Sequence, residues 1–320
     1  MKRILLLRTS SLGDILHTFP AATDIRRHVP DAVLEWVVEE EYVPLLRMHP
    51  GVARAIPFAQ RRWRRELWRP RAWQELAAFR RTLREYAYDA ILDTQGLLKS
   101  ALVAHLAHGP VHGFGARTAR EPFVAWLYDV TYEFRPEDHK IQRYRGVAAG
   151  ALGYALDAAV DYGIIAPAPP PYTPRASYCV LLHSTARAAK LWDEAAWVVV
   201  ARSLEAQGLI CVLPWGDEAE HARAQRIAKA LGQAVVAPRM SIEEAAGLVG
   251  HASAVVGLDT GLTHLAAALR VPVVGIFCDS EPIDAQPLGA GRTAYRGGIG
   301  KPPTAREVLD ALADVAPALA

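Results

Sequence analysis

The chain has 320 residues, 51% of them hydrophobic and 22% charged, which is an ordinary globular composition with enough length for two domains. The formal net charge of +2 excludes a strongly acidic or basic protein, although residues 1–165 lean basic, with 23 Lys and Arg against 19 Asp and Glu. Three scattered cysteines without a CxxC pair argue against a zinc site. No apolar run approaches the ~20 residues of a membrane span, and the apolar run near the N-terminus is too short for a signal peptide. We therefore expect a cytoplasmic protein.

The first half of the chain alternates between strand and helix patterns. Residues 2–9 form an apolar run with charged ends, as expected of a strand buried on both faces. A turn at residues 10–13 follows, and residues 14–27 carry apolar side chains at helical spacing. Further elements are predicted as a strand at 33–38, a helix at 76–86, a strand at 90–93 and a helix at 97–106. This alternation favours a parallel sheet with right-handed crossovers.

A proline-rich segment divides the chain. Residues 166–174 read APAPPPYTP, and five prolines in nine residues cannot build a helix or an inner strand. Behind it the alternation restarts, with strands predicted at 178–183, 210–214, 235–236, 254–258 and 273–277 and helices at 193–207, 218–231, 242–249, 261–269 and 304–315. We predict two Rossmann-like α/β domains, residues 1–165 and 175–320, joined by a stiff linker at 166–174. Ligands are expected in a cleft at the C-terminal strand ends.

The turn after the first strand carries Gly13 and Asp14. Gly13 permits close backbone approach, and a helix N-terminus keeps a carboxylate such as that of Asp14 ionised near neutral pH. Asp is also a favoured N-cap residue, and a cap alone is the commoner role of such an aspartate. The turn lacks GxGxxG, which weakens the case for NAD binding.

Residues 61–81 contain eight arginines against Glu66 and Glu75, with three tryptophans interleaved. Arginine suits a bidentate grip on phosphate or carboxylate. Three interpretations remain open for this segment: a solvated helix face, a nucleic-acid binding surface, and contact with an anionic membrane surface or a phosphorylated glycolipid.

Three polar sites follow predicted strands of the second half. Small and hydroxyl residues at 183–189, followed by Lys190, can line a phosphate site, although a surface loop with a solvated lysine fits equally well. Residues 259–264, DTGLTH, open a helix whose N–H groups can bind an anion, whereas His264 taken alone is more often structural. Glu220 lies near a strand end and could accept hydrogen bonds from a ribose, although an isolated glutamate is more often exposed.

Five motifs stand in a familiar order: TSSLGDILHT at 9–18, WVVEE at 36–40, DTQGLLKS at 93–100, LPWG at 213–216 and DTGLTH at 259–264. Together they resemble the lipopolysaccharide heptosyltransferases of glycosyltransferase family 9, and in particular the heptosyltransferase I branch. The resemblance runs over nearly the whole chain. It implies a two-domain GT-B fold and inverting transfer by a single displacement, without a metal or other cofactor. The implied donor is ADP-L-glycero-β-D-manno-heptose, and the implied acceptor is the Kdo region of Kdo-lipid A.

The resemblance also implies roles for residues. Asp14 would be the general base, and Lys190 with the helix after Asp259 would stabilise the ADP leaving group. The donor-binding residues that it implies are Ser10, Thr185, Lys190, Glu220, Met240, Asp259, Thr260, Gly261, Leu262 and His264. The acceptor-binding residues that it implies are Arg61, Arg62, Arg64, Arg65, Gln95, Lys99, Arg120 and Arg143.

The chain departs from the family pattern at Ala186, where a second threonine is usual, and in the loop 278–282, which reads CDSEP. The expected partners are the nucleotide sugar, the anionic glycolipid and the cytoplasmic face of the inner membrane, with peripheral association and no nucleic acid. Alternatives within the enzymes are heptosyltransferase II or III, acting on an already heptosylated core, and a nucleotide-sugar 2-epimerase of the same fold. A small-molecule binding protein or a nucleic-acid binder, whose binding would collapse with salt, are the non-enzymatic alternatives.

Overall fold

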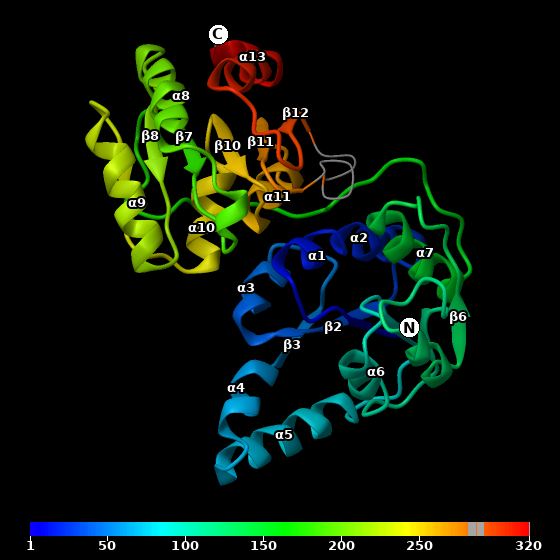
Figure 1. Cartoon of the computed structure of the whole chain (residues 1–320). Coiled ribbons are helices and arrows are strands. Elements are labelled where there is room, and N and C mark those ends of the chain that lie inside the picture. The colour runs from blue at the N-terminus through cyan, green and yellow to red at the C-terminus, as the bar shows by residue number, and fades with distance from the viewer. Residues whose placement is uncertain (281–285, 287–290, 320) are drawn as a thin grey trace. The chain divides into compact units, whose positions relative to one another are not determined.

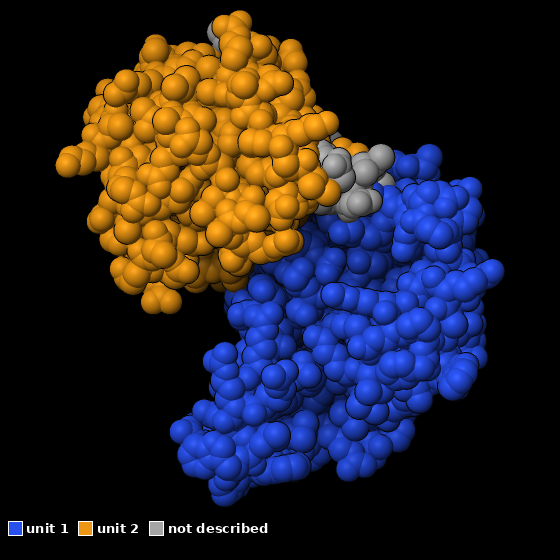
Figure 2. Space-filling view, in the orientation of Figure 1, with its two compact units in different colours: residues 1–164 blue, residues 165–320 orange. Residues whose placement is uncertain are grey.

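The computed structural model describes residues 1–280, 286 and 291–319. The chain divides into two compact units, Met1–Ile164 and Ile165–Ala320, which are coloured separately in Figure 2. The proline-rich residues 166–174 belong to the second unit. There the carbonyl oxygen of Ala168 lies so close to Gly247 that a Cβ at this glycine would be 2.4 Å away from it. Each unit is built on a six-stranded sheet (Figure 1).

The sheet of unit 1 has the strand order β3-β2-β1-β4-β5-β6, and all of its neighbours are parallel. Its strands are β1 (Arg3–Leu7), β2 (Val33–Glu39), β3 (Arg54–Phe58), β4 (Ala90–Asp93), β5 (Val111–Phe114) and β6 (Val130–Tyr132). Leu5 of β1 lies opposite Glu35 on one side and Ile91 on the other. Strands β3, β5 and β6 were not predicted. Strand β3 contains Pro57, which is tolerated because β3 is an edge strand.

The helices of unit 1 are α1 (Leu12–Leu16), α2 (Phe19–His28), α3 (Val43–Leu46), α4 (Gln60–Glu66), α5 (Pro70–Leu83), α6 (Leu98–Ala104) and α7 (Lys140–Leu152), with 3-10 turns η1 (Glu40–Tyr42) and η2 (Pro122–Leu127). Helices α2 and α7 pack together on one face of the sheet, and α5 and α6 lie on the other (Figure 1). The prediction of a single helix at 14–27 is wrong, because the structure has two helices there. The first begins at Leu12 and ends at Leu16, and Pro20 in the first turn of α2 favours a second helix start. Ser11, not Asp14, is the N-cap of α1.

Unit 2 repeats this topology, with the order β12-β11-β10-β7-β8-β9 and parallel neighbours throughout. Its strands are β7 (Tyr178–Leu182), β8 (Ile210–Leu213), β9 (Val235–Val236), β10 (Ala254–Leu258), β11 (Val273–Phe277) and β12 (Thr293–Gly297). Its helices include α8 (Glu194–Ala206), α9 (Glu218–Lys229), α10 (Ile242–Gly250), α11 (Gly261–Ala268) and α13 (Ala305–Val315), with 3-10 turns η3 (Ala188–Lys190) and η4 (Pro317–Leu319). Strand β12 was not predicted.

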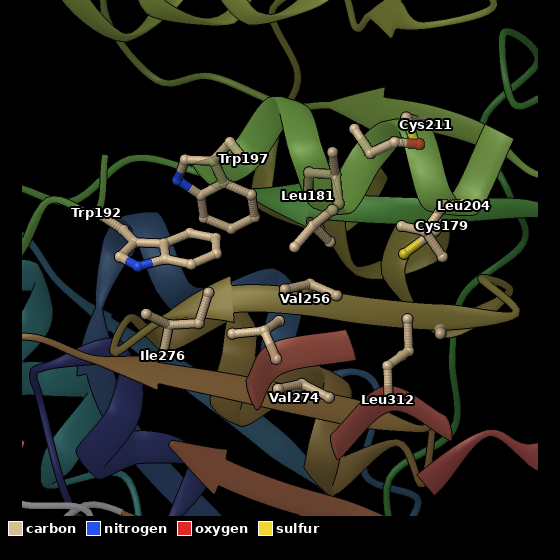
Figure 3. Close-up of a cluster of buried hydrophobic side chains, with 14 of the residues drawn as sticks. Cys179, Leu181, Trp192, Trp197, Leu204, Cys211, Val256, Val274, Ile276 and Leu312 are labelled. Carbon is tan, nitrogen blue, oxygen red and sulfur yellow. The ribbon is translucent and has the colours of Figure 1, made fainter. Parts of the chain in front are cut away.

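The core of unit 2 fills the space between its sheet and helices α8 and α13 (Figure 3). Trp192 and Trp197 pack edge to face there, with ring centroids 5.1 Å apart. Cys179 and Cys211 lie in the same cluster, where burial raises the pKa of Cys211 to about 12. These two cysteines therefore act as small apolar side chains.

Both sheets reverse their strand order beside their first strand. The reversal falls between β1 and β4 in unit 1 and between β7 and β10 in unit 2. Loops that leave neighbouring strands at such a point run in opposite directions and leave a crevice at the C-terminal strand ends. The topology therefore places one crevice beside the loops after Leu7 and Asp93, and another beside the loops after Leu182 and Leu258.

Candidate active site

A cavity of about 350 Å³ opens at the reversal point of unit 1. Loops after β1 and β4, the start of α6, the segment after β5 and helix α7 supply its lining. Of the predicted site residues, the cavity brings together Ser10, Asp14, Gln95, Lys99, Arg120 and Arg143. It also holds Arg8, Lys140 and Tyr144, which were not predicted. Arg8 had one usable signal, because it is a charged residue directly after a buried strand.

The cavity is strongly basic. Five cationic side chains line it, and Asp14 is the one carboxylate among its described lining residues. The cations are Arg8, Lys99, Arg120, Lys140 and Arg143. Burial lowers the pKa of Lys99, an effect that the nearby carboxylate of Glu39 opposes. Such a lining suits a ligand with more than one negative charge.

Asp14 lies in the first turn of α1 and keeps most of its hydrogen-bonding capacity free. Ser11 Oγ donates to its Oδ2 at 3.3 Å, and Tyr144 Oη lies 3.5 Å from its Oδ1. Burial raises the pKa of Tyr144 to about 12, so its hydroxyl stays protonated. The guanidinium of Arg8 covers the ring of Tyr144, 4.1 Å from the ring centroid. The Asp14 carboxylate can therefore accept a proton from a ligand hydroxyl.

A buried hydrogen-bond network fixes the loop after β4. Asp93 is fully buried, and its Oδ1 accepts from the backbone N–H groups of Gln95 and Gly96 at 2.8 and 3.3 Å. Gly96 has a φ of +66°, a conformation that favours glycine. Gln95 Oε1 in turn accepts from the N–H and the hydroxyl of Thr9, both at 2.9 Å. The network links the loop after β4 to the loop after β1, which sets the position of Asp14.

The structure does not bring the four predicted arginines of α4 into this cavity. Arg61 pairs with Glu41, and Arg62 pairs with Glu40 at 3.0 Å and with Glu75 at 2.7 Å. A separate groove of about 450 Å³ is lined by Glu39, Glu40, Glu41, Arg61, Arg62, Arg65 and Glu66. Arg64 and Arg65 are exposed and form no ion pair with any residue that the structure describes. Arg61 and Arg62 are thus paired with glutamates, whereas Arg64 and Arg65 are not, although Arg65 lines the same glutamate-rich groove.

In unit 2, the ends of β7 and β10 carry a hydrogen-bonded cluster around Asp259. Lys190 Nζ donates to its Oδ2 at 2.5 Å, Ser280 Oγ donates to the same oxygen at 2.7 Å, and His264 Nε2 lies 3.2 Å from Oδ1. Burial alone would raise the pKa of Asp259, but its bonds to His264, Lys190 and Ser280 hold that pKa well below the usual range. Asp259 is therefore ionised at neutral pH and orients Lys190.

The N-terminus of helix α11 adds a second feature that attracts anions to this site. Its N-cap residue, Thr260, makes no capping side-chain bond, so the first-turn N–H groups of α11 remain available to an anion. A Cβ at Gly257 would lie 2.4 Å from Thr263 Oγ1, so this glycine allows the helix to approach β10 closely. Lys190 and the start of α11 together can bind a phosphate group.

The other predicted donor-binding residues lie in less connected places. Glu220 uses one carboxylate oxygen to accept the N–H of Gly216 at 2.7 Å, at the start of α9. Thr185, Met240 and Leu262 are half-buried, and no hydrogen bond among the described residues joins Glu220 or Met240 to the Asp259 cluster. Ser10 lies in the cavity of unit 1, whereas the others lie in unit 2.

Residues 1–280, 286 and 291–319 contain no group of three or more His, Cys, Asp and Glu side chains that could hold a metal ion. In the same part of the chain, no helix is both long enough and apolar enough to cross a membrane. The three cysteines are buried and form no disulfide.

Similarity to known proteins covers both units. Residues 76–311 match the sequence profile of glycosyltransferase family 9 (heptosyltransferase). Lipopolysaccharide heptosyltransferase 1 of Pseudomonas aeruginosa is 43% identical over 282 residues, covering 88% of this chain and 79% of that protein. Its counterpart in Escherichia coli K12 is 39% identical over 286 residues, covering 88% and 89%.

Solved structures agree with this assignment. Escherichia coli heptosyltransferase WaaC with ADP is 36% identical and superposes with a TM-score of 0.88, covering 96% of this chain and 98% of that chain. This likeness confirms the predicted GT-B fold. The structure of the UDP-GlcNAc 2-epimerase of Methanocaldococcus jannaschii is only 14% identical, at a TM-score of 0.50, covering 98% of this chain and 92% of that chain, and shares the fold alone. The chain belongs to glycosyltransferase family 9, the heptosyltransferases.

Proposed function

We propose that this heptosyltransferase of lipopolysaccharide core synthesis takes its sugar from ADP-L-glycero-β-D-manno-heptose and places it on the Kdo region of Kdo-lipid A. Relatives at 39–43% identity are named lipopolysaccharide heptosyltransferase 1, and a similar WaaC structure holds ADP-2-deoxy-2-fluoro heptose. The observation that carries the proposal is the unit 1 cavity, in which one carboxylate lies among five cations. The Kdo sugar carries a carboxylate group and lipid A carries phosphates, so the basic lining of the cavity is complementary to the negative charge of this acceptor.

The acceptor reaction uses Asp14. Its carboxylate takes the proton from a Kdo hydroxyl as the hydroxyl oxygen attacks the anomeric carbon of the heptose. The new C–O bond forms while the bond between the anomeric carbon and the β-phosphate oxygen breaks, which inverts the configuration in one step. Gln95, Lys99, Arg120 and Arg143 hold the acceptor for this attack. No metal or other cofactor takes part in the proposed reaction.

The leaving ADP gains negative charge on its β-phosphate, which Lys190 and the N–H groups of α11 stabilise. Lys190 has three N–H donors and uses one for Asp259, so donors remain for the phosphate. Further proposed donor contacts are Thr185, Thr260, Gly261, Leu262 and His264 at the diphosphate, Glu220 at the ribose, Met240 at the adenine, and Ser10.

The α4 arginines would contact the outer part of the acceptor. Arg64 and Arg65 are the best placed for its phosphates, because Arg61 and Arg62 would first have to exchange their glutamate partners. Since the acceptor is a membrane lipid, the enzyme would work at the cytoplasmic face of the inner membrane as a peripheral protein.

The central test is transfer from ADP-heptose to Kdo-lipid A, followed by mass spectrometry of the product and compared with an acceptor that already carries one heptose. We expect Asp14→Asn to lower kcat by about 10²–10⁴-fold, the range for losing a general base, while ADP binding persists. Asp31→Asn, at an exposed turn of the same unit, is the matched control and should keep full activity. Near-normal turnover by Asp14→Asn would remove Asp14 from the mechanism, and preferred use of the heptosylated acceptor would reject the Kdo assignment.

A further inference from the structure

A second groove on unit 1 combines aromatic, aliphatic and basic side chains outside the proposed catalytic cavity. It has a volume of about 760 Å³ and is lined by Trp73, Leu76, Ala77, Arg80, Arg81, Arg84 and Leu106. We propose that this groove is the docking surface for an anionic phospholipid bilayer. The inference rests on the proposed function in one respect, because that function requires an acceptor embedded in a membrane.

Helix α5 supplies most of the groove, and its sequence explains why. Its buried stripe consists of Ala72, Phe79 and Leu83, which pack toward the sheet. A second stripe, with side chains spaced by three or four residues, runs from Trp73 to Arg84 along the groove. Helix α5 follows α4 at the outer edge of unit 1 (Figure 1). Its outward face therefore has the composition of an interfacial helix, with arginine beside tryptophan and aliphatic residues.

Trp73 is held in an outward position. Its side chain is 58% exposed, and its indole N–H donates to the carbonyl oxygen of Leu67 at 2.8 Å. Because this hydrogen bond already fixes the indole ring, binding of a partner to the apolar part of the ring would cost little further side-chain entropy. Tryptophan with this arrangement is typical of the zone between lipid headgroups and acyl chains.

Further exposed apolar side chains lie on α6, which ends two residues before the groove residue Leu106. Leu98 and Leu102 are four residues apart, so they share one helix face that ends near Leu106, and they are 39% and 56% exposed. Turn η2 packs against α6 and exposes 49% of Phe123 and 88% of Trp126. Single exposed apolar residues are ordinary, but Leu98 and Leu102 on one helix face, with Phe123 and Trp126 on a turn that packs against it, add apolar area of the kind that binds a partner or a membrane.

The charge of the groove selects between these two occupants. Three arginines line it and no carboxylate does among the described residues. Arg80 and Arg81 are exposed and form no ion pair within the described ranges, in contrast to Arg62, whose two glutamate partners neutralise it. Unpaired guanidinium groups around an aromatic side chain complement phosphate headgroups above acyl chains, and their aliphatic stems can lie along the apolar surface.

The test is flotation of the full-length chain with vesicles of phosphatidylglycerol and phosphatidylethanolamine, compared with vesicles of phosphatidylcholine alone. We expect binding to the anionic vesicles only, weakened by added salt. The double variant Arg80→Glu/Arg81→Glu should lose roughly tenfold or more in vesicle binding, because each basic residue contributes to the attraction. The single variant Trp73→Ala should also bind less. The matched control is Arg26→Glu/Arg47→Glu, which changes the net charge equally at exposed positions of unit 1 outside the groove and should bind like the unmodified chain.

Activity separates docking from the proposed reaction. The groove variants should transfer heptose normally to a deacylated, water-soluble Kdo acceptor, which also shows that they are folded, and should be impaired on Kdo-lipid A in vesicles. Any of three results would overturn the docking surface: equal binding of the unmodified chain to both vesicle types, full binding of the groove variants to anionic vesicles, or an equal loss of binding in the control variant. If the unmodified chain transferred heptose to neither acceptor yet bound anionic vesicles through the groove, the proposed function would fail while the docking surface would stand.

Discussion

A buried ion pair anchors helix α7 to helix α2, and its removal gives a stability effect that can be worked from the structure. Arg145 is 0% exposed and Asp24 is 2% exposed. The pair is bidentate, with Nε–Oδ2 and Nη2–Oδ1 distances of 2.6 and 3.2 Å. The same guanidinium donates to the carbonyl oxygens of Asp157 and Ala159, both at 2.9 Å. One side chain therefore holds two helices and the segment that follows α7.

Replacing Arg145 with methionine leaves Asp24 buried without its cation. Removing one partner of a buried pair destabilises a protein by about 3–5 kcal/mol, which is a large part of an ordinary total stability of about 5–15 kcal/mol. We expect Arg145→Met to lower the free energy of unfolding of unit 1 by that amount in urea denaturation followed by tryptophan fluorescence. Asp24→Asn in the same chain should restore part of it, because the uncompensated charge is then gone.

The matched control for the stability prediction, though not for the acceptor KM, is Lys140→Met on the same helix. The Lys140 side chain makes no hydrogen bond or ion pair with the described residues, so its loss should change stability by no more than about 0.5 kcal/mol. Because α7 also carries Arg143 and Tyr144 into the cavity, Arg145→Met should raise the KM for the acceptor without changing ADP affinity. A destabilisation below about 1 kcal/mol would refute the reasoning that this pair anchors α7.

Three further predictions concern the site and its surroundings. Lys190→Ala should lower kcat by about 10²–10³-fold in the transfer assay, the scale for losing one electrostatic stabiliser, whereas Lys229→Ala at the end of α9 should not; equal rates would exclude Lys190. Transfer should continue in excess EDTA, and loss of activity that a divalent metal restores would contradict the metal-free reaction. Burial lowers the pKa of His49 to about 4, so His49 is neutral in the folded chain and charged below about pH 6.5 when unfolded. Its contribution to stability is thus complete above about pH 6.5 and lost as the pH falls toward 4, by roughly 3 kcal/mol at most. Urea denaturation across this range should show a smaller loss in His49→Gln, and an identical loss would reject His49 as a source.

The sequence predicted the central parts of both sheets better than their edges. Strands β1, β4, β7 and β10 are continuous apolar runs because both of their faces are buried, and such runs stand out in a sequence. Strands β6 and β12 were missed because they are partly exposed and read VTY and TAYRG, without an apolar run. Each is the last strand at the edge of its sheet, where tertiary pairing rather than local pattern decides the conformation.

Helix α7 was missed for a different reason. Its buried face includes Arg145, and an arginine at a core position breaks the apolar period on which helix prediction depends. Its partner Asp24 lies 121 residues away, so nothing local shows that the charge is neutralised. The missed helix then hid two lining residues of the cavity, Lys140 and Tyr144. By contrast, the family resemblance named Asp14, Gln95 and Lys99, and all three follow strand ends at the reversal point, where the fold topology gathers polar side chains.

The arginine-rich segment shows why a count of charges within a window cannot assign function. The sequence alone does not distinguish its eight arginines from one another. An arginine that is already paired binds a new anion only if the new interaction offsets the free energy of breaking the existing ion pair. Glu40 and Glu41 reach Arg61 and Arg62 from the end of β2, about twenty residues earlier in the chain, and neutralise that end of the segment. Arg80 and Arg81 lie two helical turns beyond Trp73, on a face without carboxylates among the described lining residues. Two of the three interpretations that the sequence left open therefore divide along the segment: part of it is a self-neutralised helix face, and the unpaired remainder is available to phosphates of a membrane or glycolipid.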